Sequence, residues 1–373
     1  MSQFSFFNIE EQLDKINGIN DFLYRLNELI HWSIFLDLLN QIHSQEHKSN
    51  AGRPSFDVLL MFKILILKHT YNLSDDQVEL QIRDRLSFRA FWGLSFADRV
   101  PDSKTIWLFG EQLARLGLAD PLFHQFHEEL RKHNVSVKGG IIVDSTFVDV
   151  PKQHFHRDEY QQIKKGEKPA SRTAKPEVES QTDFDARYTK KNGEKHYGYK
   201  NHVLADSETK IIVDYEVTDA ATHDNKPFLD LVPAKAEKNE NGENGENNEK
   251  QAKTEDDTKE KKAPIPVFGD SAFKSKKHDA ELRRRGFDPQ INEKGYRNHP
   301  LTDEQKANNK LKSKTRCRIE HIFGAQKMRM GNEIMRTIGK VRAAFQIGMR
   351  NLVYNMSRLV RLKRPTKVII RKS

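Results

Sequence analysis

Cysteine is almost absent from this 373-residue chain, and long apolar runs are missing altogether. With Cys317 as the single thiol, neither an internal disulfide nor a cysteine-based zinc site can form. No stretch approaches the roughly 20 apolar residues that a membrane-spanning helix needs. Residues 1–7 have neither the basic flank nor the small-residue cleavage site of a secretory signal. These absences predict a cytoplasmic protein without a membrane partner.

Acidic residues are scarce near the C-terminal end. Residues 310–373 contain 18 Lys and Arg but only two acids, Glu320 and Glu333, which gives this segment a net charge of +16. Because the whole chain carries +10, the remainder is net −6. A basic segment of this kind is typical of a polyanion-binding surface, and the plainer alternative is a solvated basic face.

The first third of the chain has helical periodicity, from Asn8 to about Lys132. A nearly all-apolar helix is predicted to begin near Pro54, and Ser74 is placed to cap the next helix. Two more short helices are predicted at residues 86–94 and 101–107. We therefore expect an all-helical N-terminal DNA-binding domain over residues 1–135, either of helix-turn-helix type or an ordinary set of packed helices.

After Gly139 the period changes to that of strands. Strands are predicted at residues 140–150, 197–205, 210–218, 266–269 and 288–291, and helices at 225–236, 275–285, 313–329 and 340–362. This order predicts an α/β fold over residues 136–363, with a mixed sheet that is covered by helices on both faces.

Two polar stretches interrupt this pattern. Residues 154–187 are predicted to form a polar loop, and its His154 and His156 have no partners at metal-ligand spacing. Residues 235–262 are rich in Asn, Glu, Gly and Lys and contain almost no apolar residues, which predicts a disordered insert. Residues 364–373 are predicted to form a basic tail.

Three acids are placed where carboxylates could meet. Asp144 and Asp270 each follow a short apolar run, and Glu320 lies in a predicted helix that also carries basic residues. Grouped carboxylates in a basic protein favour metal-dependent chemistry on phosphates. Each acid also has an ordinary explanation, since the two aspartates are placed to cap turns or helices and Glu320 is placed to pair with Arg316.

The same residues carry a family resemblance. Arg316, Glu320 and Lys327 resemble the R-x3-E-x6-K signature of DDE transposases from bacterial insertion sequences, and the chain is most similar to the insertion-sequence-5 group, which is related to the insertion-sequence-4 type. Residues 142–146, 268–275 and 318–324 match in addition, as do the N-terminal segments 53–55, 83–89 and 100–107. Ser313 occupies the position at which the wider signature has a tyrosine.

The resemblance implies a ribonuclease H-like catalytic core in which Asp144, Asp270 and Glu320 are both the catalytic residues and the ligands of two Mg²⁺ ions, replaceable by Mn²⁺. It implies cleavage at the terminal inverted repeats of an insertion sequence and joining of the freed 3′ ends to target DNA. The expected partner is double-stranded DNA, bound by a homodimer associated with the nucleoid.

Four basic residues are the candidate DNA contacts. The resemblance implies that Arg316 and Lys327 reach phosphates beside the metal site, and we add Arg318 and Lys200, the latter in a basic segment interleaved with tyrosines.

Two other functions remain open on the sequence. One is a catalytically silent DNA-binding regulator derived from a transposase, and the other is a metal-dependent nuclease without strand transfer.

Overall fold

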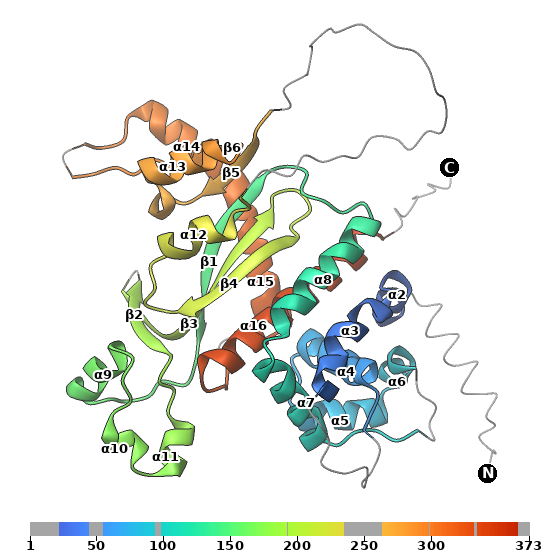
Figure 1. Ribbon diagram of the computed structural model, residues 1–373. Helices are drawn as coiled ribbons and strands as arrows, with labels where there is room; N and C mark the ends of the chain where they lie inside the picture. Colours follow the sequence, from blue (N-terminus) through green and yellow to red (C-terminus); the bar gives the residue numbers. More distant parts are fainter. Residues whose placement is uncertain are drawn as a thin grey trace, which may run out of the picture.

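The structure, a computed structural model, describes residues 22–44, 55–93, 98–191, 193–234, 263–297, 299–331 and 334–364. A group of helices near the N-terminus precedes a curled sheet with helices on both faces (Figure 1). The predicted α/β class with a preceding helical region is therefore confirmed. The predicted insert at 235–262 and all but the first residue of the basic tail lie outside the described residues.

The N-terminal region is helical throughout its described part. Its elements are α2 (Phe22–Leu29), η1 (Trp32–Phe35), α3 (Leu36–Leu39), η2 (Asn40–Ser44), α4 (Val58–Tyr71), α5 (Asp75–Asp84), α6 (Leu86–Trp92), α7 (Ser103–Arg115) and α8 (Ala119–Lys132). The apolar helix begins after Asp57, whose carboxylate accepts a hydrogen bond from the Leu60 amide, and not near Pro54. Ser74 caps α5 as predicted, by accepting from the Gln77 amide.

The sheet has three antiparallel strands on one side and two parallel strands on the other. Strand β1 (Ile141–Asp149) pairs antiparallel with β3 (Glu194–Asp206), which pairs antiparallel with β4 (Ile212–Asp219). On its other side β1 pairs parallel with β5 (Ile265–Gly269), and β5 pairs parallel with β6 (Phe287–Ile291). Each of these strands lies within one to three residues of its predicted position.

The predicted polar loop at 154–187 is wrong in its local structure. It contains α9 (Arg157–Lys164), α10 (Ala170–Thr173) and α11 (Pro176–Gln181), and it leads into an additional strand, β2 (Arg187–Lys191), which pairs with the first half of β3. Polar contacts and a small group of aromatic rings, Phe155, Tyr160 and Tyr188, hold this segment together. Arg172 binds the Glu159 carboxylate, and Asp183 accepts hydrogen bonds from the Tyr199 hydroxyl and three backbone amides.

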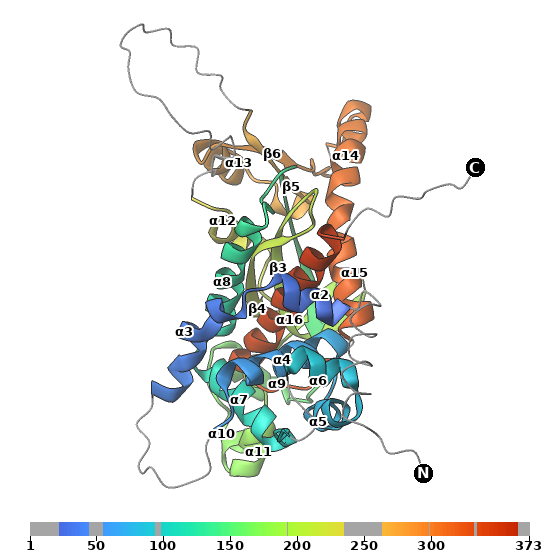
Figure 2. The ribbon, with the colours of Figure 1, turned by 90° about the vertical axis from the view of Figure 1, so that its right-hand side faces the viewer.

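The helices of the second half are α12 (Asn225–Leu231), η3 (Ser271–Phe273), α13 (Lys276–Arg284), α14 (Asp303–Arg316), η4 (Cys317–Ile319), α15 (Glu320–Arg329) and α16 (Lys340–Leu362). The prediction of one helix over 313–329 is wrong, because α14 begins ten residues earlier and the 3₁₀ turn η4 separates it from α15. The three elements follow one another along one side of the sheet (Figure 2). The long helix at 340–362 is confirmed.

The two faces of the sheet bury different residues, as the alternation of a strand requires. Ile141 and Val143 of β1 pack in a small core with α12 and α13, whereas Ile142 packs in a larger core that contains the N-terminal helices and α16. Both faces are thus covered, as predicted. Among the described helices, none combines the length and apolar character that a bilayer crossing demands.

Helix α16 connects the two regions. It packs against α2, α4, α7 and α8 on one side and against β3 and β4 on the other (Figures 1 and 2). Gly348 permits this approach, since a Cβ there would collide with the Tyr215 hydroxyl and lie 2.9 Å from the Cβ of Ala119. A domain boundary was predicted at residue 135. The parts of the chain before and after this residue share one apolar core.

Candidate active site

Asp144 and Asp270 lie at the same level on neighbouring strands. In the parallel pairing of β1 with β5, Ile142 is the partner of Phe268, and continuing that register by two residues places Asp144 beside Asp270. Asp270 directly follows the end of β5, as predicted. Asp144 differs from the prediction, because it lies in the middle of β1, which continues for five residues beyond it in its pairing with β3.

Burial dominates the electrostatics of Asp144. Its side chain is 17% exposed, and burial raises the pKa of its carboxyl to about 6. The hydrogen bond from the Ser145 amide and the charge of Arg316 oppose this rise in pKa, while the negative charge of Asp270 adds to it. The two aspartates are therefore close enough to repel each other, which is the arrangement that a cation relieves.

The Asp270 carboxylate also has a local role. It caps η3 by accepting a hydrogen bond of 2.8 Å from the Ala272 amide. The alternative role of Asp270 as a helix cap is therefore partly correct. Asp270 caps η3, whereas Ser275 caps α13. One cap bond through a single oxygen leaves the second oxygen of this half-buried group available to a ligand.

Arg316 pairs with Asp144 and not with Glu320. Its Nη1 lies 2.9 Å from Oδ2 of Asp144, which is a contact from α14 to β1. The predicted pairing of Arg316 with Glu320, one helical turn away, is not present. The Nε of Arg316 is buried without a hydrogen-bond partner in the described part of the chain. A buried guanidinium donor without a partner is uncommon in folded proteins and is often found at functional sites.

Glu320 is the first residue of α15, and η4, the turn before it, packs against β1. The Glu320 side chain is exposed and has no hydrogen-bond or ion-pair partner among the described residues. Within those residues, the oxygens of Asp144, Asp270 and Glu320 do not all come within 4.8 Å of one another. The structure thus brings two of the predicted ligands together and places the third on the adjacent helix with its carboxylate unpaired.

The donor set fits a hard divalent cation. All three predicted ligands are carboxylates, which are the ligands that Mg²⁺ and Mn²⁺ prefer. Burial and the charge of Asp270 destabilise the charged form of Asp144, and the cations that act on it, Arg316 and Lys191, offset only part of this effect.

A second group of possible metal ligands lies on other elements. Asp120 and His124 of α8 meet Asp214 of β4, with ligand atoms within 4.8 Å of one another. The hydrogen bond that His124 donates to the Asp120 carboxylate raises the pKa of His124, which makes this group an ion-paired histidine at the surface. The imidazole itself can thus supply the positive charge between these two carboxylates.

The predicted DNA contacts have different surroundings. Lys327 is exposed on α15, and Arg318 is exposed while donating a hydrogen bond to the Ser207 carbonyl. Lys200 is only 7% exposed, and its ammonium binds the Thr222 carbonyl and the Asp224 carboxylate. Its burial argues against a direct contact between Lys200 and DNA.

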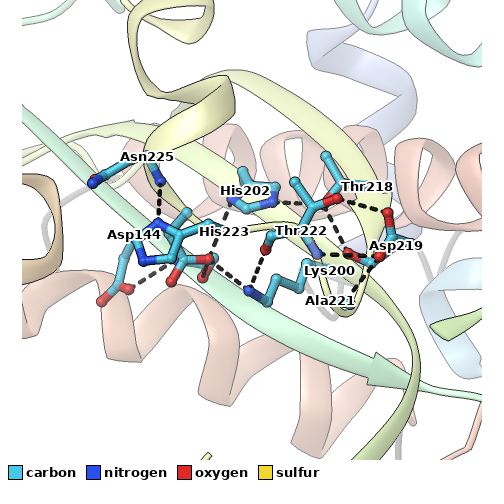
Figure 3. A network of polar contacts seen from close by, with 11 residues as sticks. Asp144, Lys200, His202, Thr218, Asp219, Ala221, Thr222, His223 and Asn225 are labelled. Atoms are coloured by element: carbon cyan, nitrogen blue, oxygen red, sulfur yellow. Dashed lines mark hydrogen bonds and ion pairs between the residues drawn. The ribbon is translucent and has the colours of Figure 1, made fainter. Parts of the chain in front are cut away.

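The Lys200 contact belongs to a polar network beside Asp144 (Figure 3). Asp224 accepts hydrogen bonds from Lys200 at 2.9 Å and from the Ser145 hydroxyl at 3.0 Å, and these contacts hold the pKa of Asp224 below its usual value. His202 lies 3.9 Å from Asp224 and 2.8 Å from the Thr218 hydroxyl, and burial lowers the pKa of His202 to about 4. The network fixes β1 at the residue next to Asp144.

Sequence reasoning missed Asp224 and Ser145 as parts of this site. The signal for Asp224 was present, because it follows strand β4 and precedes helix α12 just as Asp270 follows β5. Ser313, where the wider signature has a tyrosine, accepts a hydrogen bond from the Asn292 side chain at the end of the sheet.

Comparisons with known proteins found matching families and a similar solved structure. Residues 10–112 match a family described as "Transposase domain (DUF772)", and residues 136–356 match the family "Transposase DDE domain". The cryo-EM structure of a piggyBac transposase synaptic complex with hairpin DNA is similar over 90% of this chain and 74% of that chain, with 11% sequence identity and a TM-score of 0.43. Since the second family covers more than half of the sequence, the chain belongs to the DDE transposases, proteins of DNA transposition and recombination.

Proposed function

We propose that this chain is an insertion-sequence transposase of the insertion-sequence-5 group, related to the insertion-sequence-4 type. It cleaves DNA at the terminal inverted repeats and joins the 3′ ends to target DNA. The catalytic core is ribonuclease H-like. Three antiparallel strands followed by two parallel ones, in the spatial order β4-β3-β1-β5-β6, support this core.

The observation that carries the proposal is the pair of Asp144 and Asp270 on adjacent strands, with Glu320 at the start of the neighbouring helix. These three carboxylates hold two divalent cations, Mg²⁺ or Mn²⁺. When bound, the ions supply an activated oxygen nucleophile and stabilise the charge of the leaving oxygen. The same carboxylates serve both hydrolysis and strand transfer, because only the nucleophile differs between the two reactions.

The remaining residues position these carboxylates and the DNA. Arg316 orients Asp144 through its ion pair. The network of Ser145, Asp224 and Lys200 holds β1 rigid next to Asp144. Lys327 lies two helical turns beyond Glu320 and binds the DNA backbone. A homodimer brings the two element ends together.

The test combines labelled duplexes of the bordering inverted repeats with a supercoiled target plasmid and Mg²⁺. The wild-type chain should yield strand-transfer products. Asp144→Asn, Asp270→Asn and Glu320→Gln should each lose at least about 1,000-fold in rate, since each removes several kcal/mol of charge stabilisation. Asp120→Asn, in the other carboxylate group, is the matched control and should keep its activity.

Other outcomes select the other functions. Nicked but unjoined DNA identifies a nuclease without strand transfer, and shifted but uncut DNA identifies a silent DNA-binding regulator. Wild-type cleavage in all three site variants, or its loss in Asp120→Asn alone, contradicts the assignment of the site to Asp144, Asp270 and Glu320.

A further inference from the structure

A groove rich in arginine lies beyond the far end of α15 from Glu320. Its volume is about 700 Å³, and it is bounded by α15, the last turns of α16 and the ends of two N-terminal helices. Arg329 ends α15, while Arg358, Arg361 and Arg364 come from α16 and the residues after it. No acidic residue is among those that line this groove in the described chain. The groove is therefore a concave surface of one charge sign.

Further cations adjoin the groove at the turn between β3 and β4. Arg318 donates to the Ser207 carbonyl, and Arg358 donates to the Thr209 carbonyl at 2.5 Å. Lys210 of the same turn lies close enough that burial and the charges of Arg358 and Arg318 lower its pKa. Hydrogen bonds to the backbone thus hold Arg318 and Arg358 at this turn, and Lys210 is part of the turn itself.

The acids of this turn do not neutralise these cations. Asp206 accepts hydrogen bonds from the amides of Lys138, Gly139 and Thr209. Glu208 points toward Gly139, since a Cβ on that glycine would collide with the Glu208 side chain. Within the described residues, none of the four groove arginines forms an ion pair with a carboxylate. Like charges held together in this way repel each other until an anion binds between them.

The spacing relates the groove to the proposed catalytic site. Nine residues separate Glu320 from Arg329 along α15, which is about 14 Å at 1.5 Å per residue. One DNA strand carries a phosphate about every 3.4 Å along the duplex axis, so this length corresponds to about four nucleotides. A phosphate backbone that runs parallel to α15 from the catalytic carboxylates would therefore reach the groove within half a helical turn.

We infer that this groove binds the sugar-phosphate backbone of DNA about four nucleotides from the bond to be cleaved, through Arg329, Arg361 and Arg364, with Arg358 holding the β3–β4 turn in place. The inference deepens the proposed function and rests on it for the position of the cleaved bond. Binding is independent of base sequence, because guanidinium groups in a backbone groove contact phosphates and not base edges.

The experiment measures duplex affinity in EDTA at several salt concentrations, so that cleavage does not intervene. In Arg361→Gln/Arg364→Gln the slope of log K against log salt concentration should decrease in magnitude by about 1.8, equally on inverted-repeat and unrelated DNA. Arg361→Lys/Arg364→Lys should restore most of the slope. The matched control is Arg131→Gln/Lys168→Gln, which removes two ion-paired surface cations elsewhere and should change the slope by less than half as much.

Equal slopes in the groove variant and the control variant overturn the inference, as does a wild-type chain that does not bind DNA. A groove variant that alters only self-association identifies the groove as a protein interface and also overturns it. Phosphate ethylation should interfere with binding about four nucleotides from the cleavage point in the wild type only. Binding is measured without metal, so it does not depend on cleavage. Absence of cleavage by the wild-type chain in the Mg²⁺ assay would therefore contradict the proposed function, while the salt dependence of binding would still test the groove.

Discussion

Asp144 is held in the fold at a cost to stability. Burial raises the pKa of its carboxyl from 3.8 to about 6, so its charged form is less favourable in the folded chain than in the unfolded chain. The destabilisation is fully present above pH 6 and disappears as the pH falls below 3.8. A buried carboxylate of this kind is typical of a ligand-binding site, because the ligand removes the cost when it binds.

Asp144→Asn should therefore stabilise the metal-free protein. A pKa difference of about two units corresponds to at most about 3 kcal/mol in the free energy of unfolding at pH 8. Urea unfolding in EDTA at pH 8 and pH 5 measures this difference, which should be largest at pH 8 and about half as large at pH 5. Millimolar Mg²⁺ should stabilise the wild type but not the variant.

Asp303→Asn, at a fully exposed position, serves as the control and should show no such dependence on pH. If Asp144→Asn is less stable than the wild type at pH 8, then its ion pair with Arg316 outweighs the burial cost, and the case for a ligand-relieved carboxylate fails.

The location of a single residue could be predicted where it depended only on the residue's position relative to a strand. Asp270 follows its strand as the apolar run predicts, whereas Glu320, expected inside a helix over residues 313–329, begins α15 instead. Lys200 was not predictable as buried, because its partner Asp224 is 24 residues away and only the pairing of β3 with β4 brings them together. The sequence shows a charge but not the distant residue that neutralises it.

At the scale of elements, one amide network joins three of them. Asn351 of α16 exchanges hydrogen bonds with Asn201 of β3 in both directions, and its carbonyl also accepts one from Gln326 of α15. All three side chains are buried. The network therefore fixes α15, the helix that begins with Glu320, against the sheet that carries Asp144.

Asn351→Leu, which keeps the approximate volume, should destabilise the chain by about 2–5 kcal/mol. The substitution leaves the amides of Asn201 and Gln326 without their partner, at about 1–3 kcal/mol for each buried group. Thermal and urea unfolding measure the loss. Gln346→Leu on the same helix, at a half-buried position outside the network, should change stability by less than about 1 kcal/mol. Similar losses in both variants refute a specific role for the amide network.

Elements with strong apolar periodicity were predicted well, and polar ones were not. The boundaries of α16 agree because its apolar residues recur at helical spacing over its whole length. Helices α9 to α11 bury a single residue, Ile163, so no apolar periodicity marks them. Helix α14 has no buried residues, and its start at the Thr302 cap was recognisable only from capping chemistry.

At the scale of the molecule, the N-terminal helices and the sheet share one core through α16. The three tryptophans, Trp32, Trp92 and Trp107, all lie in the N-terminal helices, whereas the backbone signal in circular dichroism comes from the whole chain. Because α16 is common to both regions, the two signals should change together in urea, with midpoints that agree within error. An earlier transition in tryptophan fluorescence contradicts the shared core and supports an independent domain that ends near residue 135.

The position of α16 in the chain has a consequence for synthesis. Helices α2 to α8 are made first, yet the helix that completes their core follows α7 by more than 220 residues. At about 5–20 residues per second the ribosome needs roughly 10–45 s to translate that interval. Throughout this time the nascent N-terminal helices expose the apolar surface that α16 later covers. We therefore expect a product that terminates before α16 to be degraded and not to persist as a separate repressor at the inverted repeats.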